Sequence, residues 1–192
     1  MSFWTKDYSQ TGITNPKRNF RFRVQFTNID QYAEELEGTY LWYAKTADKP
    51  SFTLGETSHA YLNHTFKFPG RVTWNDVSIA MVDPGGNKGL AYGLTLLLKN
   101  SGYAIPQGAA SNADFATISK SSAVSAIGDV IVEQLDEDGN ALEKWILYNA
   151  FISDVKYGNL DYSSDDLTEY TVSLRYDWAA YDTDGSAVDF SA

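Results

Sequence analysis

The 192-residue sequence contains no cysteine, and its longest apolar runs fall short of the roughly 18 residues that a membrane-spanning helix needs. Without cysteine, neither a disulfide framework nor a thiolate metal site is possible. The polar, aromatic start MSFWTKDYSQTG does not follow the pattern of a signal peptide. We therefore expect a soluble protein that is made in the cytoplasm and does not contact a membrane.

Motifs for catalysis and for metal or phosphate binding are also missing. The only two histidines, His59 and His64, have no third ligand at a metal-site spacing, and the G-x-S-x-G motif of hydrolases is absent. The glycines of 85–89 lack the spacing of a phosphate-binding loop. The acidic stretches 136–140 and 182–189 lack the ligand pattern of a calcium loop. The sequence predicts no enzyme, no cofactor and no bound metal.

Positive charge is scarce: 15 Lys and Arg stand against 25 Asp and Glu, which gives a formal net charge of −10. The acidic excess lies in residues 76–192, whereas residues 1–75 are slightly cationic. Proteins that wrap nucleic acid need Lys and Arg to contact its phosphates. The composition argues against that class, and solubility alone is a sufficient role for the acidic surface.

Alternation of apolar and polar residues predicts a strand over 167–181, LTEYTVSLRYDWAAY. One face carries Tyr170, Val172, Leu174, Tyr176 and Trp178. The other face carries Glu169, Thr171, Ser173, Arg175 and Asp177. A strand of this kind has one face in a core and one polar face turned to water or to a partner.

Similar patterns predict further strands over residues 19–27, 38–47, 61–70 and 71–83. Pro69-Gly70 is expected to separate the last two of these strands. His64 alternates with apolar residues and is expected to be a hydrogen-bonded core or interface residue. Residues 48–60 are expected to form a long loop. Residues 129–155 predict two strands joined by a hairpin turn at 137–140.

One helix is predicted by Leu90, Leu94, Leu97 and Leu98, and it ends before Gly102. We expect a single domain with a flexible N-terminal arm (1–18), a surface insertion (103–128) with room for one short helix, and a frayed C-terminal tail (179–192). The predicted fold is mainly β, with about seven antiparallel strands and one packed helix, arranged as a sandwich or a partly closed barrel.

Two parts of the sequence carry a resemblance to a known family. AKTADKPS is followed, after a long segment, by FPGRVTWNDVSIAMVD, and KWILYNAFISDVKYGNLDYSSDDLTEYTVSLRYDW occupies residues 144–178. In this order the chain resembles the tail tube protein family of contractile-tailed bacteriophages, over roughly residues 19–178. The sequence departs from the family pattern in 103–128 and after Tyr181.

The resemblance implies a structural virion protein whose homohexameric rings stack into an inner tail tube, assembled in the host cytoplasm. The sheets of each ring would join into one continuous β-barrel around a channel for DNA ejection, without specific DNA binding. The implied partners are other copies of the chain and the tail sheath, tape-measure, baseplate and tail terminator proteins. Ring closure removes exposed strand edges, and stacking of unlike surfaces continues as an open filament.

On this reading the polar residues of 167–181 face the channel, with two more from the strand 71–83. The candidate lumen-facing residues are Glu169, Thr171, Ser173, Arg175, Asp177, Asp76 and Ser78. An acidic channel would keep DNA phosphates from adhering to its wall. The alternative is that this face meets outside solvent. Arg21 and Arg23 are expected to pair with acidic residues of a neighbouring subunit or of the sheath.

A second set of residues is expected to form contacts between subunits or rings. It is drawn from the N-terminal arm, from the strand 38–47 and from the loop 48–60, where aromatic and apolar residues have no obvious place in a monomer. The candidates are Phe3, Trp4, Trp42, Tyr43, Pro50, Phe52, Leu54 and Tyr61.

Two alternative functions are open at this point. The first is the inner tube of a type VI secretion system or of an extracellular contractile injection system, whose lumen passes protein effectors. The second is a monomeric β-sandwich that binds carbohydrate, with Trp42, Tyr43 and Tyr61 as stacking platforms.

Overall fold

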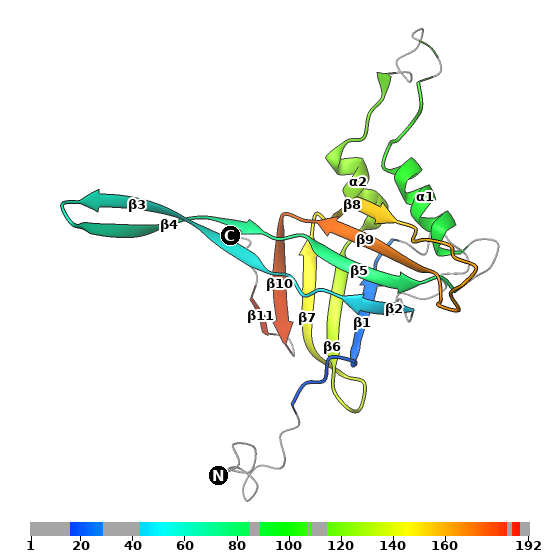
Figure 1. Cartoon of the computed structure of the whole chain (residues 1–192), viewed down its shortest axis with the longest axis horizontal. Helices are drawn as coiled ribbons and strands as arrows, with labels where there is room; N and C mark the ends of the chain where they lie inside the picture. Colours follow the sequence, from blue (N-terminus) through cyan, green and yellow to red (C-terminus); the bar gives the residue numbers. More distant parts are fainter. Residues whose placement is uncertain are drawn as a thin grey trace, which may run out of the picture.

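Two antiparallel sheets form the body of the protein, and a two-stranded arm leaves the body to one side (Figure 1). The computed structural model describes residues 16–28, 43–84, 89–106, 108, 115–183 and 186–188. The candidate contact residues Phe3, Trp4 and Trp42 lie outside these ranges. Within them, no helix is both long and apolar enough to cross a membrane.

The first sheet has five strands in the order β1-β6-β7-β10-β11. They are β1 (Phe22–Phe26), β6 (Val130–Leu135), β7 (Ala141–Tyr148), β10 (Trp178–Thr183) and β11 (Ser186–Val188). The hairpin predicted at 137–140 is confirmed: Asp136 Oδ1 accepts hydrogen bonds from the N–H groups of Asp138 and Asn140. Residues 179–183 are not a frayed tail, because β10 pairs with β7 and buries Ala179 and Ala180.

The second sheet has four strands in the order β2-β5-β9-β8. They are β2 (Ala44–Ala47), β5 (Val77–Val82), β9 (Glu169–Arg175) and β8 (Phe151–Lys156). The chain passes between the sheets at two sharp corners, one at Asn149 (φ 55°) and one at Asp177. Each corner divides a segment that the sequence presents as one continuous strand, so β7 and β8, and likewise β9 and β10, belong to different sheets.

One core joins both sheets to a helix. It contains Val24 and Leu147 from the first sheet and Ile79 and Val172 from the second, all almost completely buried. Helix α1 (Leu90–Asn100) confirms the predicted helix and adds Leu90, Leu94 and Leu97 to this core, while Leu98 is exposed. Gly102 follows the helix with φ 98°, a conformation that favours glycine.

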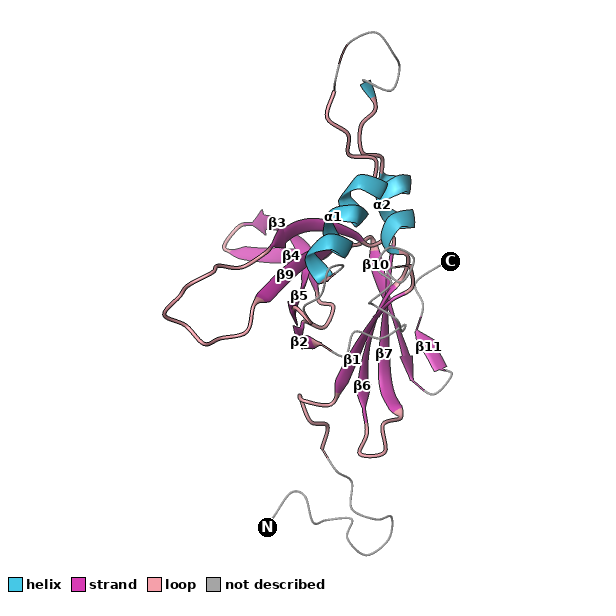
Figure 2. Ribbon diagram, turned by 90° about the vertical axis from the view of Figure 1, so that its right-hand side faces the viewer, coloured by secondary structure: helices cyan, strands magenta, loops and turns pink. Residues whose placement is uncertain are grey.

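Helix α2 (Lys120–Ile127) lies beside α1 at one end of the body (Figure 2). Its first turn is capped by the Ser119 side chain, which accepts a hydrogen bond from the Ser122 N–H. Ala126 and Ile127 are buried in the core. The segment 103–128, expected to be a surface insertion, therefore packs into the core at its C-terminal end.

The arm is a hairpin of β3 (Phe52–Tyr61) and β4 (His64–Trp74), so residues 48–60 are not a long loop. Strand β4 also continues through Pro69 and Gly70. Proline lacks an N–H group, and its position next to a register shift, in a ribbon that has only edge strands, is one that a strand tolerates. Every residue from 52 to 73 is exposed, including His64, which therefore lies outside the core.

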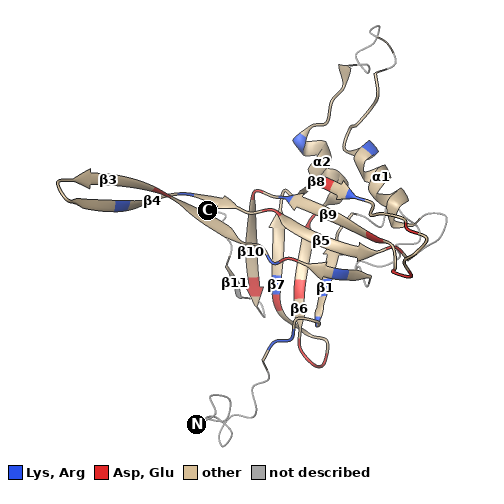
Figure 3. Ribbon diagram, viewed as in Figure 1, with Lys and Arg blue, Asp and Glu red and all other residues tan. Residues whose placement is uncertain are grey.

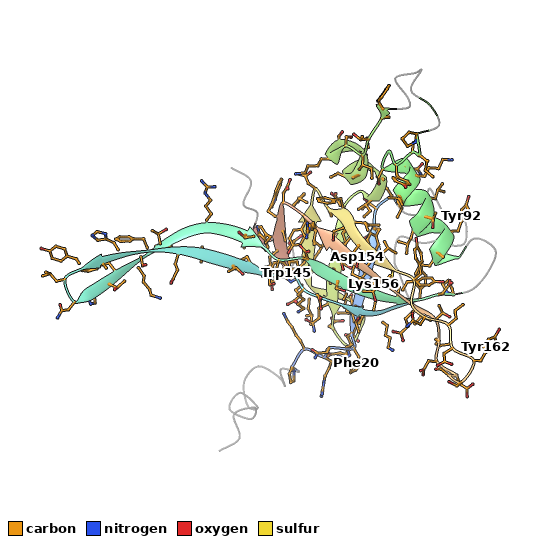
Figure 4. The ribbon with its side chains drawn as sticks, turned by 45° about the horizontal axis from the view of Figure 1, so that its top comes forward. Phe20, Tyr92, Trp145, Asp154, Lys156 and Tyr162 are labelled. Atoms are coloured by element: carbon orange, nitrogen blue, oxygen red, sulfur yellow. The ribbon has the colours of Figure 1, made fainter. Side chains whose placement is uncertain are left out.

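The side chains of the arm project into open space, and among the elements of the described chain none packs over its outer part (Figures 1 and 4). Only at its base does the ribbon meet the body, where the Trp74 ring contacts Tyr176 at 5.9 Å between centroids. The arm is thus held at one end and is otherwise surrounded by water.

Leu147→Ala tests the shared core. We expect it to lower the free energy of unfolding by about 2–5 kcal/mol, because it leaves a cavity at a side chain that is fully buried. The matched control is Leu160→Ala, at a side chain that is 90% exposed, where a change within about 0.5 kcal/mol is expected. Chemical denaturation measures both, and equal effects would contradict the location of the core.

Candidate assembly surfaces

The polar face of the four-stranded sheet contains most of the predicted lumen residues. Ser78 lies opposite Ser173, and Thr171 lies opposite Ala80, so the polar residues of β5 and β9 share one face. The buried residues Tyr170, Val172 and Leu174 of β9 point the other way, into the core. The two-faced pattern predicted for residues 167–181 is confirmed over β9 and Tyr176, but the single strand is not, because residues from Trp178 onward belong to β10 in the other sheet.

Charges on this polar face are paired with one another. Lys45 Nζ lies 2.5 Å from Glu169 Oε1, and Arg175 Nε lies 3.2 Å from Asp76 Oδ2. On β8, the Lys156 and Asp154 side chains approach to 3.8 Å (Figures 3 and 4). This surface carries both signs of charge in close pairs, and an acidic channel wall stays a prediction.

Asp177 is separated from the other candidate lumen residues. It follows β9 at the corner between the sheets, where its carboxylate lies 2.6 Å from Lys120 Nζ of α2 and accepts a hydrogen bond of 2.8 Å from the Asn149 amide. The hydrogen bond from Lys120 is the main cause that lowers the pKa of Asp177 below its ordinary value. Asp177 thus ties α2 to the corner at Asn149.

The candidate contact residues divide into two groups. Tyr43 and Pro50 are buried within their own chain and are not free for contacts between subunits. Phe52, Leu54 and Tyr61 are exposed on the arm, each by more than half of its surface. Because Tyr43 is in the core and Tyr61 is at the tip of the arm, these two rings do not form the carbohydrate platform considered as an alternative.

The arginines of β1 and of the residues before it have partners in the same chain. Arg23 pairs with Glu133 of β6, and Arg21 Nη1 lies 3.3 Å from Glu137 Oε2. The expectation that these arginines pair with another subunit or with the sheath is therefore not supported. The cross-strand register explains the pairing, since Arg23 lies directly opposite Glu133.

A buried ion-pair cluster around Glu143 was missed from the sequence. Glu143 of β7 pairs with Lys17, which precedes β1, and with Lys49, in the loop between β2 and the arm. Lys49 Nζ also donates a 2.6 Å hydrogen bond to the Gln134 side chain. The cluster fastens the root of the arm and the segment before β1 to the same strand. One signal was available, because Glu143 alternates with Trp145 and Leu147 on an otherwise apolar face.

Electrostatics favour the ionised form of Glu143. Burial alone would raise the pKa of its carboxyl, but the hydrogen bonds from Lys17 and Lys49 prevail and hold this pKa below the ordinary value. The hydrogen bond to Glu143 in turn raises the pKa of Lys17. Among the described residues, no three His, Asp or Glu side chains are grouped so that they could hold a metal ion.

The protein is mainly β and has the fold of tail-tube proteins. It consists of two antiparallel sheets around a shared core, two short helices at one end and a protruding two-stranded arm. No protein-family model matches the sequence, and no curated protein matches it. The similarity that exists is one of structure.

Three solved structures illustrate it. A chain in the cryo-EM structure of the anti-feeding prophage cap, a tube-terminating cap, is 15% identical and superposes with a TM-score of 0.62, covering 93% of this chain and 98% of that one. A chain in the sheath/tube terminator of the PVC extracellular contractile injection system is 14% identical, with a TM-score of 0.61 and coverages of 90% and 100%. A chain of the PVC sheath-tube complex is 14% identical and superposes with a TM-score of 0.57, covering 95% of this chain and 99% of that one. The TM-scores and coverages establish a shared fold over nearly the whole chain, at low sequence identity.

Glu143→Gln tests the buried cluster. It keeps the shape of the side chain but removes the charge that Lys17 and Lys49 share, so the free energy of unfolding is expected to fall by about 1–3 kcal/mol at pH 7. The pKa of Glu143 is lower in the folded than in the unfolded chain. The stabilisation is therefore present above the ordinary pKa of a glutamate and disappears as the pH falls through the folded value.

The control for this variant is Glu137→Gln, which removes an exposed partner of Arg21 and is expected to cost less than about 0.5 kcal/mol. Urea denaturation of both variants and the wild type at pH 7 and near pH 3 provides the measurement. A loss for Glu143→Gln that does not shrink at the lower pH would contradict the assignment.

Proposed function

We propose that this chain is the tube subunit of a contractile injection system, whose copies form rings that stack into an inner tube. The observation that carries this proposal is the arm. A ribbon of two strands that exposes Phe52, Leu54 and Tyr61 to water gains nothing in a monomer, and such a hairpin is only marginally stable alone. Contact with further copies of the chain covers these side chains.

The shared fold supports the same proposal. The compared structures are a tube-terminating cap, a sheath/tube terminator and a sheath-tube complex, all of contractile machines, and another chain of similar fold occurs in the baseplate of the anti-feeding prophage. We accordingly propose a sheath around the tube and a baseplate at its end as partners. The role is structural and involves no catalysis.

Among such machines, an extracellular contractile injection system is favoured over a phage tail, because two of the compared structures with the same fold come from such a system. A phage tail tube is the second candidate, on the strength of the sequence resemblance of residues 144–178. Nucleic acid inside purified native particles would favour the phage, and protein cargo would favour the injection system.

The polar face of the four-stranded sheet is proposed to line the channel. Strands β2 and β8 are the two edges of this sheet, and pairing of one edge with the opposite edge of a neighbour would continue the sheet around a ring. Its ion pairs leave few unpaired cations to which phosphates or acidic cargo would adhere. A wall of this kind lets cargo slide without binding it.

Electron microscopy of the purified chain over a concentration series, with light scattering for mass, tests the proposal directly. We expect rings with a central hole at low concentration and tubes at higher concentration, because stacking of unlike surfaces is open-ended. A monomer at every concentration, including in the presence of the cognate sheath protein, would overturn it.

Single cysteines test which face lines the channel, since the natural chain has none to interfere. In intact tubes, Thr171→Cys and Ser173→Cys are expected to react with a small maleimide but not with a maleimide coupled to a large protein such as ferritin. The same variants before assembly are the control and should react with both. Labelling of intact tubes along their length by the large reagent would mean that the polar face meets outside solvent.

A further inference from the structure

The arm contains a β-bulge near its middle. Leu54 pairs with Val72, but Glu56 pairs with Pro69, so two residues of β4, Gly70 and Arg71, stand opposite the single residue Gly55 of β3. A Cβ atom on Gly70 would lie 3.1 Å from the backbone C and O atoms of Gly55. This close approach of two backbones explains why glycine occupies position 70.

The bulge changes which side chains of β4 share a face. In an uninterrupted strand, Phe66, Phe68, Val72 and Trp74 would all point to one side, because they are separated by even numbers of residues. The extra residue shifts the alternation by one. Phe66 and Phe68 therefore lie on the opposite face of the ribbon from Val72 and Trp74.

The arm consequently has two apolar patches. The base patch is Phe52, Leu54 and Val72, on the face that carries Trp74, where the Phe52 and Trp74 rings meet edge to face at 5.4 Å between centroids. The tip patch is Tyr61, His64, Phe66 and Phe68, on the other face, with the His64 and Phe66 rings 4.7 Å apart. All members of both patches are exposed.

We propose that the arm binds two different copies of this chain at once, one through the base patch and another through the tip patch. This inference rests on the proposed function and adds which surfaces of the arm meet which copies. One partner surface covers one face of a ribbon, and the patches lie on opposite faces on either side of the bulge. Two covered faces therefore require two partner surfaces.

Charge favours another copy of the same chain as the partner. In the arm, Lys67 and Arg71 outnumber the single acidic residue Glu56, whereas the chain as a whole has a net charge of −10. Glu56 is itself paired with Lys67 at 3.1 Å. A cationic arm on an acidic molecule is attracted to the body of the next molecule, which is a heterologous, head-to-tail contact (Figure 3).

The test uses the photo-crosslinking residue p-benzoylphenylalanine, which is aromatic like Phe52 and Tyr61. Three variants of the full chain carry it in place of Phe52, in place of Tyr61, or in place of both. Each is assembled with a large excess of wild-type chain, so that its neighbours are wild type, then irradiated and analysed on a denaturing gel. A second double variant, at Leu54 and Phe68, repeats the measurement with independent positions in the same two patches.

Each single variant is expected to give a product of two chains, and each double variant a product of three chains. Rings or tubes in which the double variants give only two-chain products, or in which one of the patches does not crosslink, would overturn the inference while the proposed function stands. Absence of rings, tubes and crosslinks together would instead overturn the proposed function.

Discussion

A ribbon of two strands has no interior, and this constraint governs how the molecule divides its apolar residues. The body closes one core between its two sheets and α1, and there Ile79, Leu147 and Val172 are removed from water by their own chain. The arm cannot do the same, because its side chains contact one another across the two strands but no other layer of the described chain covers them. The single chain therefore buries the apolar residues of its body and leaves those of its arm exposed, and in the proposed assembly it is contact between copies that covers them.

The sequence predicts those elements whose pattern is set by the core. The alternation in residues 169–176, the helix of Leu90, Leu94 and Leu97 and the turn at 137–140 are all found, because one side of each is buried or its turn residues are specific. The changes of sheet at Asn149 and Asp177 are not visible in the pattern, since apolar residues continue on both sides of each corner. For the same reason the sequence shows one long strand where the structure has two.

The arm and the Glu143 cluster illustrate a different reason for failure. Residues 52–61 carry small and polar side chains between their apolar ones and read as a loop, because neither face has the uniform character that burial within one chain imposes. Pro69-Gly70 reads as a strand break, although at a bulge both residues are compatible with a strand. The polar face that β5 and β9 share could be predicted from the alternation of their residues. Its ion pairs could not, because they involve Lys45 and Asp76, whose positions are set by the tertiary structure.

The attachment of the arm root to the body through Lys49 and Glu143 has a consequence for how the arm responds to its solvent. The lysines of the cluster are about half exposed, so added salt screens this attachment, while strongly hydrated salts such as sulfate strengthen the association of apolar surfaces. The ion pairs at the root of the arm and its apolar patches therefore have opposite salt responses. A salt that strengthens the association of the apolar patches therefore also weakens the ion pairs that hold the root of the arm to the body.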